Sequence, residues 1–141
     1  MEWLELKTQE AIEDFMNDFC GFHDSCITNV VYSTGMVVEE DKSMGIESEK
    51  NNAKIIFQSQ IADAIEIHFQ EIQILNINTN INRFEDIFGA TFKIINTSIY
   101  WIGECFANDV DFQNTKKFLD KGDSNFNYII CKKVSYRKIK K

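Results

Sequence analysis

The segment from Cys20 to Cys26 brings together more chemically reactive side chains than any other stretch of the sequence. It also contains His23, Asp24 and Ser25, so it holds one of the two histidines and two of the four cysteines. A thiol or hydroxyl nucleophile beside an imidazole base is one chemistry that these residues would supply, and a metal ion held by sulfur and nitrogen is another. The segment joins a predicted helix to a predicted strand, and such connections often carry functional groups.

The spacing of these residues argues against a metal site. Cys20, His23 and Cys26 would supply three ligands, whereas a structural zinc site needs about four. The fourth would have to come from a distant cysteine or histidine, and no closely spaced cysteine pair is present. We therefore expect free thiols and neither a bound metal nor another cofactor.

Geometry also argues against a catalytic triad within the segment. Consecutive residues of an extended chain point in opposite directions, so His23, Asp24 and Ser25 cannot converge on one another. Aspartate and serine in turns commonly bond to nearby backbone groups. The sequence thus favours a structural turn, and a binding role for these same three residues is the alternative.

The elements around the segment follow from the pattern of apolar residues. Three- and four-residue spacing predicts a helix over Thr8–Cys20 with Thr8 as its N-cap and Gly21 as its end. One stripe of this helix is apolar: Ile12, Phe15, Met16 and Phe19.

Alternating or β-branched stretches after the helix predict an antiparallel sheet. The predicted strands are 26–33, 53–59, 64–69, 90–95, 98–103 and 126–139, with a hairpin turn at Asn96-Thr97. The apolar phase shifts after residue 69, which requires a bulge or tight turn near Gln70 and Glu71. Glu66 and His68 share a face of their strand, where they form either an acid/base couple or an ordinary exposed face.

The remaining segments are polar or short. Gly35 allows a turn into 36–38, and residues 39–52 read as an acidic, mobile loop. Residues 76–82 read as a strand end and turn, residues 83–88 as one helical turn, and residues 104–125 as a polar stretch with few apolar anchors.

The charge is distributed unevenly. The chain has 141 residues and a net charge of −7, but its last ten residues carry six of the 15 Lys and Arg and no Asp or Glu. The rest of the chain, with nine basic and 22 acidic residues, has a net charge of −13. Such a body repels nucleic acids and anionic membranes and attracts basic proteins. Clustered acids in the 39–52 loop, namely Glu39, Glu40, Asp41, Glu47 and Glu49, are the predicted contact residues.

The compartment follows from the N-terminus and the apolar runs. The first five residues, Met-Glu-Trp-Leu-Glu, lack the basic flank and apolar core of a signal peptide. No apolar run approaches the roughly 18 residues of a membrane span. We expect a cytoplasmic protein with reduced cysteines.

Several short motifs give the chain a resemblance to a known group. They are Phe15-Met16, Gly21-Phe22-His23-Asp24-Ser25-Cys26-Ile27, Tyr32, Gly35, Ile65-Glu66-Ile67-His68-Phe69 and Ser98-Ile99-Tyr100-Trp101. In this order they resemble a group of small bacterial proteins with a helix, a Phe-His-Asp turn, an Ile-Glu-x-x-Phe strand and a late aromatic strand. Members are more similar to immunity or accessory proteins of bacterial toxin systems than to enzymes. The resemblance implies a non-enzymatic role and supplies no catalytic residues.

These observations predict a single α+β domain over residues 1–141, in which the N-terminal helix packs on an antiparallel, strongly curved sheet that forms a partial barrel or sandwich. The expected function is a non-enzymatic, immunity-like interaction module, monomeric or homodimeric, that binds a basic protein through its acidic surface. The candidate binding residues are His23, Asp24, Ser25, Glu39, Glu40 and Asp41. The alternative is a small-ligand-binding or hydrolytic domain with a pocket near His23.

Overall fold

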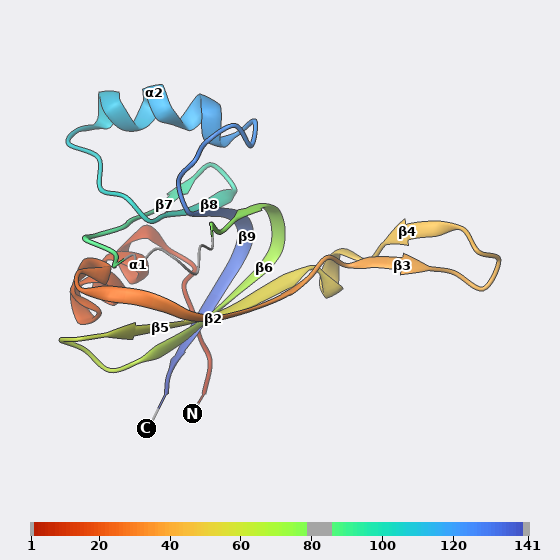
Figure 1. Ribbon diagram of the computed structural model, residues 1–141, viewed down its shortest axis with the longest axis horizontal. Coiled ribbons are helices and arrows are strands. Elements are labelled where there is room, and N and C mark those ends of the chain that lie inside the picture. Colours follow the sequence, from red (N-terminus) through yellow and green to blue (C-terminus); the bar gives the residue numbers. More distant parts are fainter. Residues whose placement is uncertain (1, 79–85, 140–141) are drawn as a thin grey trace.

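In the part of the chain that the structure describes, two α-helices, a seven-stranded antiparallel sheet and a separate hairpin build a fold of the predicted α+β class (Figure 1). The computed structural model describes residues 2–78 and 86–139. The predicted turn over 76–82 and helical turn over 83–88 lie largely outside these ranges.

The strand order of the main sheet is β2-β5-β6-β9-β8-β7, and β1 pairs with β9. The strands are β1 (Leu4–Glu5), β2 (Ser25–Ser33), β5 (Asn52–Ser59), β6 (Ile65–Asn76), β7 (Thr91–Ile95), β8 (Ser98–Ile102) and β9 (Tyr128–Lys138). The predicted hairpin of β7 and β8 is confirmed. In β6, Glu71 has a φ of +53° and the register shifts between Ile72 and Ile74, so the predicted bulge is present close to its expected place.

The helix α1 (Gln9–Asp18) begins as predicted, because the Thr8 side chain accepts a hydrogen bond from a first-turn amide at 3.0 Å. Its apolar stripe faces the sheet, and Phe15 is buried. The Gln9 Oε1 atom accepts a hydrogen bond from the Ile94 amide at 2.8 Å, which ties the start of the helix to β7.

A second helix, α2 (Asp109–Leu119), covers the opposite face of the sheet at the β7–β8 end (Figure 1). Trp101 packs in the core beneath α1, whereas its neighbour Tyr100 packs with Phe112 and Leu119 of α2. A strand buried on both faces needs a cover on each. The sequence indicates only a polar stretch with few apolar anchors over 104–125 and does not predict α2, which docks through a few apolar side chains such as Phe112 and Leu119.

The prediction of a strongly curved sheet was also wrong, because the sheet is neither closed nor strongly curled. Closure into a barrel requires the two edge strands to pair, and the edges β2 and β7 stand at opposite ends of the strand order. In a barrel the sheet covers its own apolar face by closing on itself, whereas here α1 covers one apolar face of the sheet and α2 covers the other. No partial barrel or sandwich forms.

The strands β3 (Met36–Val38) and β4 (Met44–Ile46) form a hairpin that projects from the end of β2 (Figure 1). We call residues 36–46 the arm. The loop predicted over 39–52 was thus wrong in part, because it contains β4 and a 3-10 turn, η2 (Ser48–Lys50). Gly35, with a φ of +78°, allows the chain to enter the arm, and a Cβ atom there would lie 2.7 Å from the Glu47 carbonyl oxygen.

Candidate functional site

The turn between α1 and β2 adopts a left-handed backbone conformation, and it contains a buried phenylalanine, Phe22. All three residues of the 3-10 turn η1 (Cys20–Phe22) have φ between +55° and +66°, a region that bulky residues rarely adopt. Such strain costs about 1–3 kcal/mol for each of the two non-glycine residues, Cys20 and Phe22, and persists only when packing compensates for it. Phe22 is fully buried, and its ring centroid lies 4.9 Å from that of Phe19 and 5.6 Å from that of Trp101.

His23, Asp24 and Ser25 do not form one site. The His23 Nδ1 atom lies 2.9 Å from the Asp24 Oδ2 atom, and these side chains are 56% and 34% exposed. Ser25 is buried, and its hydroxyl donates a hydrogen bond to the Phe22 carbonyl at 2.5 Å. Ser25 therefore bonds to the turn backbone as expected, whereas the Asp24 carboxylate pairs with the histidine ring at the surface.

The four cysteines are free thiols in different surroundings. Burial raises the pKa of Cys131 to about 12, so this thiol is protonated and inert at neutral pH. Cys20 and Cys105 are exposed. Within residues 2–78 and 86–139, no group of three or more His, Cys, Asp or Glu could hold a metal ion, so Cys20, His23 and Cys26 do not converge.

Three of the five acids predicted to contact a partner, Glu39, Glu40 and Asp41, lie at the tip of the arm, whereas Glu47 and Glu49 lie near its base. Glu39 and Glu40 are exposed, and the Glu39 amide closes the turn by donating to the Ser43 carbonyl at 2.8 Å. The Asp41 carboxylate accepts hydrogen bonds from the Ser43 hydroxyl at 2.6 Å and amide at 2.9 Å, which lower the pKa of Asp41. Asp41 thus holds the turn, while the two glutamates face solvent. The strand β2 separates this tip from His23, so the structure does not bring the two candidate sets together.

An apolar face of the arm was missed by the sequence reasoning. Met36 pairs with Ile46, and Val38 pairs with Met44. Residues that are directly opposed, or two apart on one strand, share a face. We call these four residues the apolar stripe; their exposed fractions are 53% for Met36, 66% for Val38, 77% for Met44 and 69% for Ile46. Met44-Gly45-Ile46 alternates, but Met36-Val37-Val38 is apolar throughout, so these two three-residue strands gave no clear periodic signal on either side of the acidic tip.

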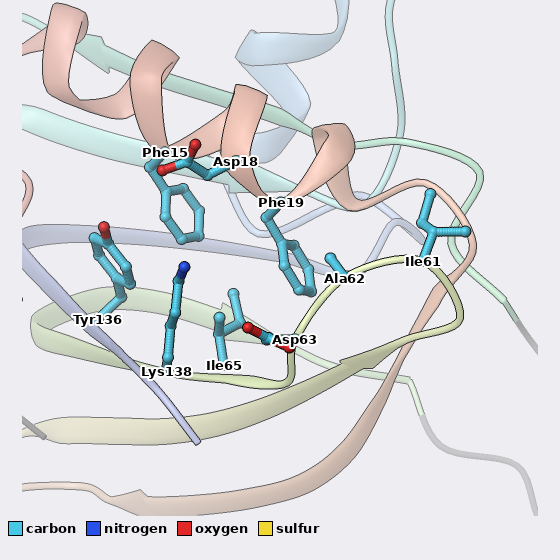
Figure 2. Close-up of a pocket in the computed structure, with 9 residues that line it drawn as sticks. All are labelled: Phe15, Asp18, Phe19, Ile61, Ala62, Asp63, Ile65, Tyr136 and Lys138. Atoms are coloured by element: carbon cyan, nitrogen blue, oxygen red, sulfur yellow. The ribbon is translucent and has the colours of Figure 1, made fainter. Parts of the chain in front are cut away.

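A pocket of about 290 Å³ lies between α1, the connection that leads into β6 and the end of β9 (Figure 2). Its nine lining residues are Phe15, Asp18, Phe19, Ile61, Ala62, Asp63, Ile65, Tyr136 and Lys138. Burial, followed by the charge of Asp18, raises the pKa of Tyr136. The lining contains no serine, cysteine or histidine, and His23 is not part of it. The expected pocket near His23 is thus not this one.

Glu66 and His68 lie on the sheet face opposite α1, and the structure gives each a different polar contact, Arg137 for Glu66 and the Asn52 side chain for His68. The Arg137 guanidinium pairs with the Glu66 carboxylate at 2.7 Å and lies 4.5 Å from the Trp3 ring centroid. The Trp3 ring in turn lies 5.5 Å from the His68 ring. Burial, followed by the charge of Lys54, lowers the pKa of His68, which therefore favours its neutral form.

No protein-family model matches the chain, and no curated protein or solved structure is significantly similar to it. None of the helices in the described ranges is long and apolar enough to cross a membrane. Among the surfaces described, the arm alone combines predicted contact residues with an exposed apolar face.

Proposed function

We propose that the protein is a non-enzymatic cytoplasmic interaction module that captures a basic protein partner with its arm. The observation that supports this most directly is the position of Glu39 and Glu40, which are exposed at the tip of a projecting hairpin (Figure 1). Charges at a projecting tip lie nearest to an approaching partner, so they contribute strongly to electrostatic steering.

The charge of the body favours the same type of partner. Outside its last ten residues the chain has a net charge of −13, and this field accelerates encounter with basic proteins while it disfavours nucleic acids and anionic lipids. Basic residues near the C-terminus are partly neutralised within the fold, because Lys133 pairs with Glu5 and Arg137 pairs with Glu66.

An immunity-like role is the specific form of this proposal. The motif resemblance points to immunity or accessory proteins of bacterial toxin systems. Toxins that act on nucleic acids are commonly basic, and an acidic inhibitor gains a fast association rate from charge complementarity.

Affinity capture from cells of the source organism tests the proposal. The tagged full chain should retain a basic protein at low ionic strength and release it at high salt. The variant Glu39→Gln/Glu40→Gln should retain much less of that protein. The control Glu13→Gln/Asp14→Asn removes the same charge from exposed positions on α1, far from the arm (Figure 1), and should retain it normally. Equal retention by both variants would contradict capture by the arm.

Small-molecule binding in the pocket of Figure 2 is the second candidate function. Aromatic rings next to carboxylates, a lysine and a tyrosine are suited to a small amphipathic ligand. Chemical-shift changes on adding a small-molecule library, confined to Phe19, Asp63 and Tyr136, would support it. No change at these residues would exclude the pocket as a ligand site for the compounds screened.

A further inference from the structure

We propose that the arm inserts its apolar stripe into an apolar groove of a protein partner, and that the rim of this groove is basic. The inference rests on the proposed function and deepens it. In this proposal the acidic tip attracts the partner, and the apolar stripe forms the contact that holds the partner once it is bound.

The exposure of the stripe is the first argument. Its four side chains, Met36, Val38, Met44 and Ile46, are between 53% and 77% exposed and lie together on one face. Singly exposed apolar residues are ordinary on protein surfaces, but a contiguous group commonly marks an interaction site. Within the described residues, no element other than the partner strand of the hairpin packs extensively on β3 or β4. The fold therefore leaves the stripe uncovered.

The charges around the stripe specify the chemistry of the groove. Glu40 stands exposed at the tip of the arm, and Glu49 stands exposed near its base. The Glu39 carboxylate lies beside Gly45 and Val37, on the face of the arm opposite the stripe. Glu47, also near the base, already pairs with Lys50. A groove that receives the stripe brings its rim close to Glu40 at one end and Glu49 at the other, so lysine and arginine are the rim residues that complement them.

The same charges argue against a second copy of the chain as the occupant. Two arms would bring acidic tips and acidic bodies together, and like charges in juxtaposition oppose association. The basic strand β9 of another copy offers reduced compensation, because two of its four basic residues, Lys133 and Arg137, are already engaged by Glu5 and Glu66. A distinct basic protein fits the arm better.

The stripe and the tip affect different rate constants. Exposed charges act mainly on the association rate and its salt dependence, whereas buried apolar contacts act mainly on the dissociation rate. Measuring the two rate constants separately therefore tests the apolar contact independently of capture by charge.

The first measurement is photocrosslinking in cells with p-benzoylphenylalanine. Val38 lies on the stripe, and Val37 lies on the other face of the same strand, so it provides the matched position. We expect strong crosslinking from position 38 to one basic protein and weak crosslinking from position 37. Equal crosslinking from both faces, crosslinking of position 38 to a second copy of the chain, or no crosslink would each overturn the inference.

The second measurement uses the crosslinked protein, purified, in binding kinetics with the full chain. The variant Val38→Ser/Met44→Ser should raise the dissociation rate roughly tenfold to a hundredfold and leave the association rate within about twofold. Val37→Ser should change neither rate by more than about threefold. An unchanged dissociation rate would refute the inference even if the association rate still fell with salt. If the association rate is insensitive to salt, the proposed capture by charge fails instead.

Discussion

Replacing Phe22 tests whether burial of its ring supplies the free energy that stabilises the left-handed turn between α1 and β2. The side chain is fully buried and contacts several aromatic rings. Loss of such a ring costs about 3–5 kcal/mol, so Phe22→Ala should remove about 4 kcal/mol from a free energy of unfolding that is typically about 5–15 kcal/mol. The exposed Phe118, which is 50% accessible, provides a control, and Phe118→Ala should cost less than about 0.5 kcal/mol.

A comparison of glycine with alanine separates backbone strain from packing. The Phe22 φ is +66°, where a Cβ atom costs about 1–2 kcal/mol. Phe22→Gly should therefore be more stable than Phe22→Ala by about 1 kcal/mol. Phe69, fully buried inside β6, should show the opposite order, because glycine in a strand is less favourable than alanine by about 0.5–1 kcal/mol.

Urea unfolding followed by tryptophan fluorescence measures all of these free energies, since Trp101 lies 5.6 Å from the Phe22 ring. A cost below about 1 kcal/mol for Phe22→Ala would refute the packing argument. The same order of glycine and alanine at Phe22 and Phe69 would refute the strain argument.

Other regions give further predictions. In the folded protein a thiol reagent should modify the exposed Cys20 and leave Cys131 unmodified until unfolding, because burial raises the pKa of Cys131 to about 12; early modification of Cys131 would contradict its burial. Trp3→Ala should raise the pKa of His68 toward the ordinary value of about 6.5, followed by NMR titration of the ring, since burial is the main cause that lowers it. Because the fold favours the neutral ring, His68 should also make the free energy of unfolding decrease as the pH falls below about 6.5, and a His68→Asn variant should lose that part of the decrease. Asp120→Asn should lower the free energy of unfolding by roughly 1 kcal/mol, measured in urea at neutral pH, because the carboxylate accepts a 2.6 Å hydrogen bond from a tyrosine hydroxyl and pairs with a lysine at 2.7 Å while partly exposed; no change would show that solvent screens the pair.

Local patterns predicted most of the sheet and the first helix. The apolar spacing around Phe15 gave α1, the Thr8 cap gave its start, and alternation gave the central strands and the β7–β8 hairpin. The phase shift near Glu71 gave the bulge. These features depend on neighbours in sequence, so periodicity alone suffices to find them.

The second helix depends on contacts distant in sequence, and its own segment is mostly polar. The signal lay elsewhere, in strands whose consecutive residues are all apolar, such as Tyr128–Cys131 and 99–102. Consecutive apolar residues in a strand point to both faces, so each face requires a cover. A sheet that needs a cover on each face is consistent with an open sheet between two helices rather than with the expected barrel.

The candidate site was predicted only in part. The Glu39–Asp41 acids were identified by their clustering, but the pairing of Met36 and Val38 with residues across the turn joins two very short strands that no periodicity reveals. The position of Trp3 over His68 depends on the pairing of β1 with β9 and could not be read from either segment alone.

The salt dependence of the association rate tests the central claim most directly. The full chain, Glu39→Gln/Glu40→Gln and Glu13→Gln/Asp14→Asn should each be mixed with the purified basic partner over a series of ionic strengths. The two variants carry the same net charge and differ only in where it was removed. We expect the arm variant to associate about three- to tenfold more slowly at low salt, with a shallower salt dependence, and the α1 variant to stay within about twofold of the full chain. Equal rates and equal salt slopes for the two variants would contradict capture by the arm.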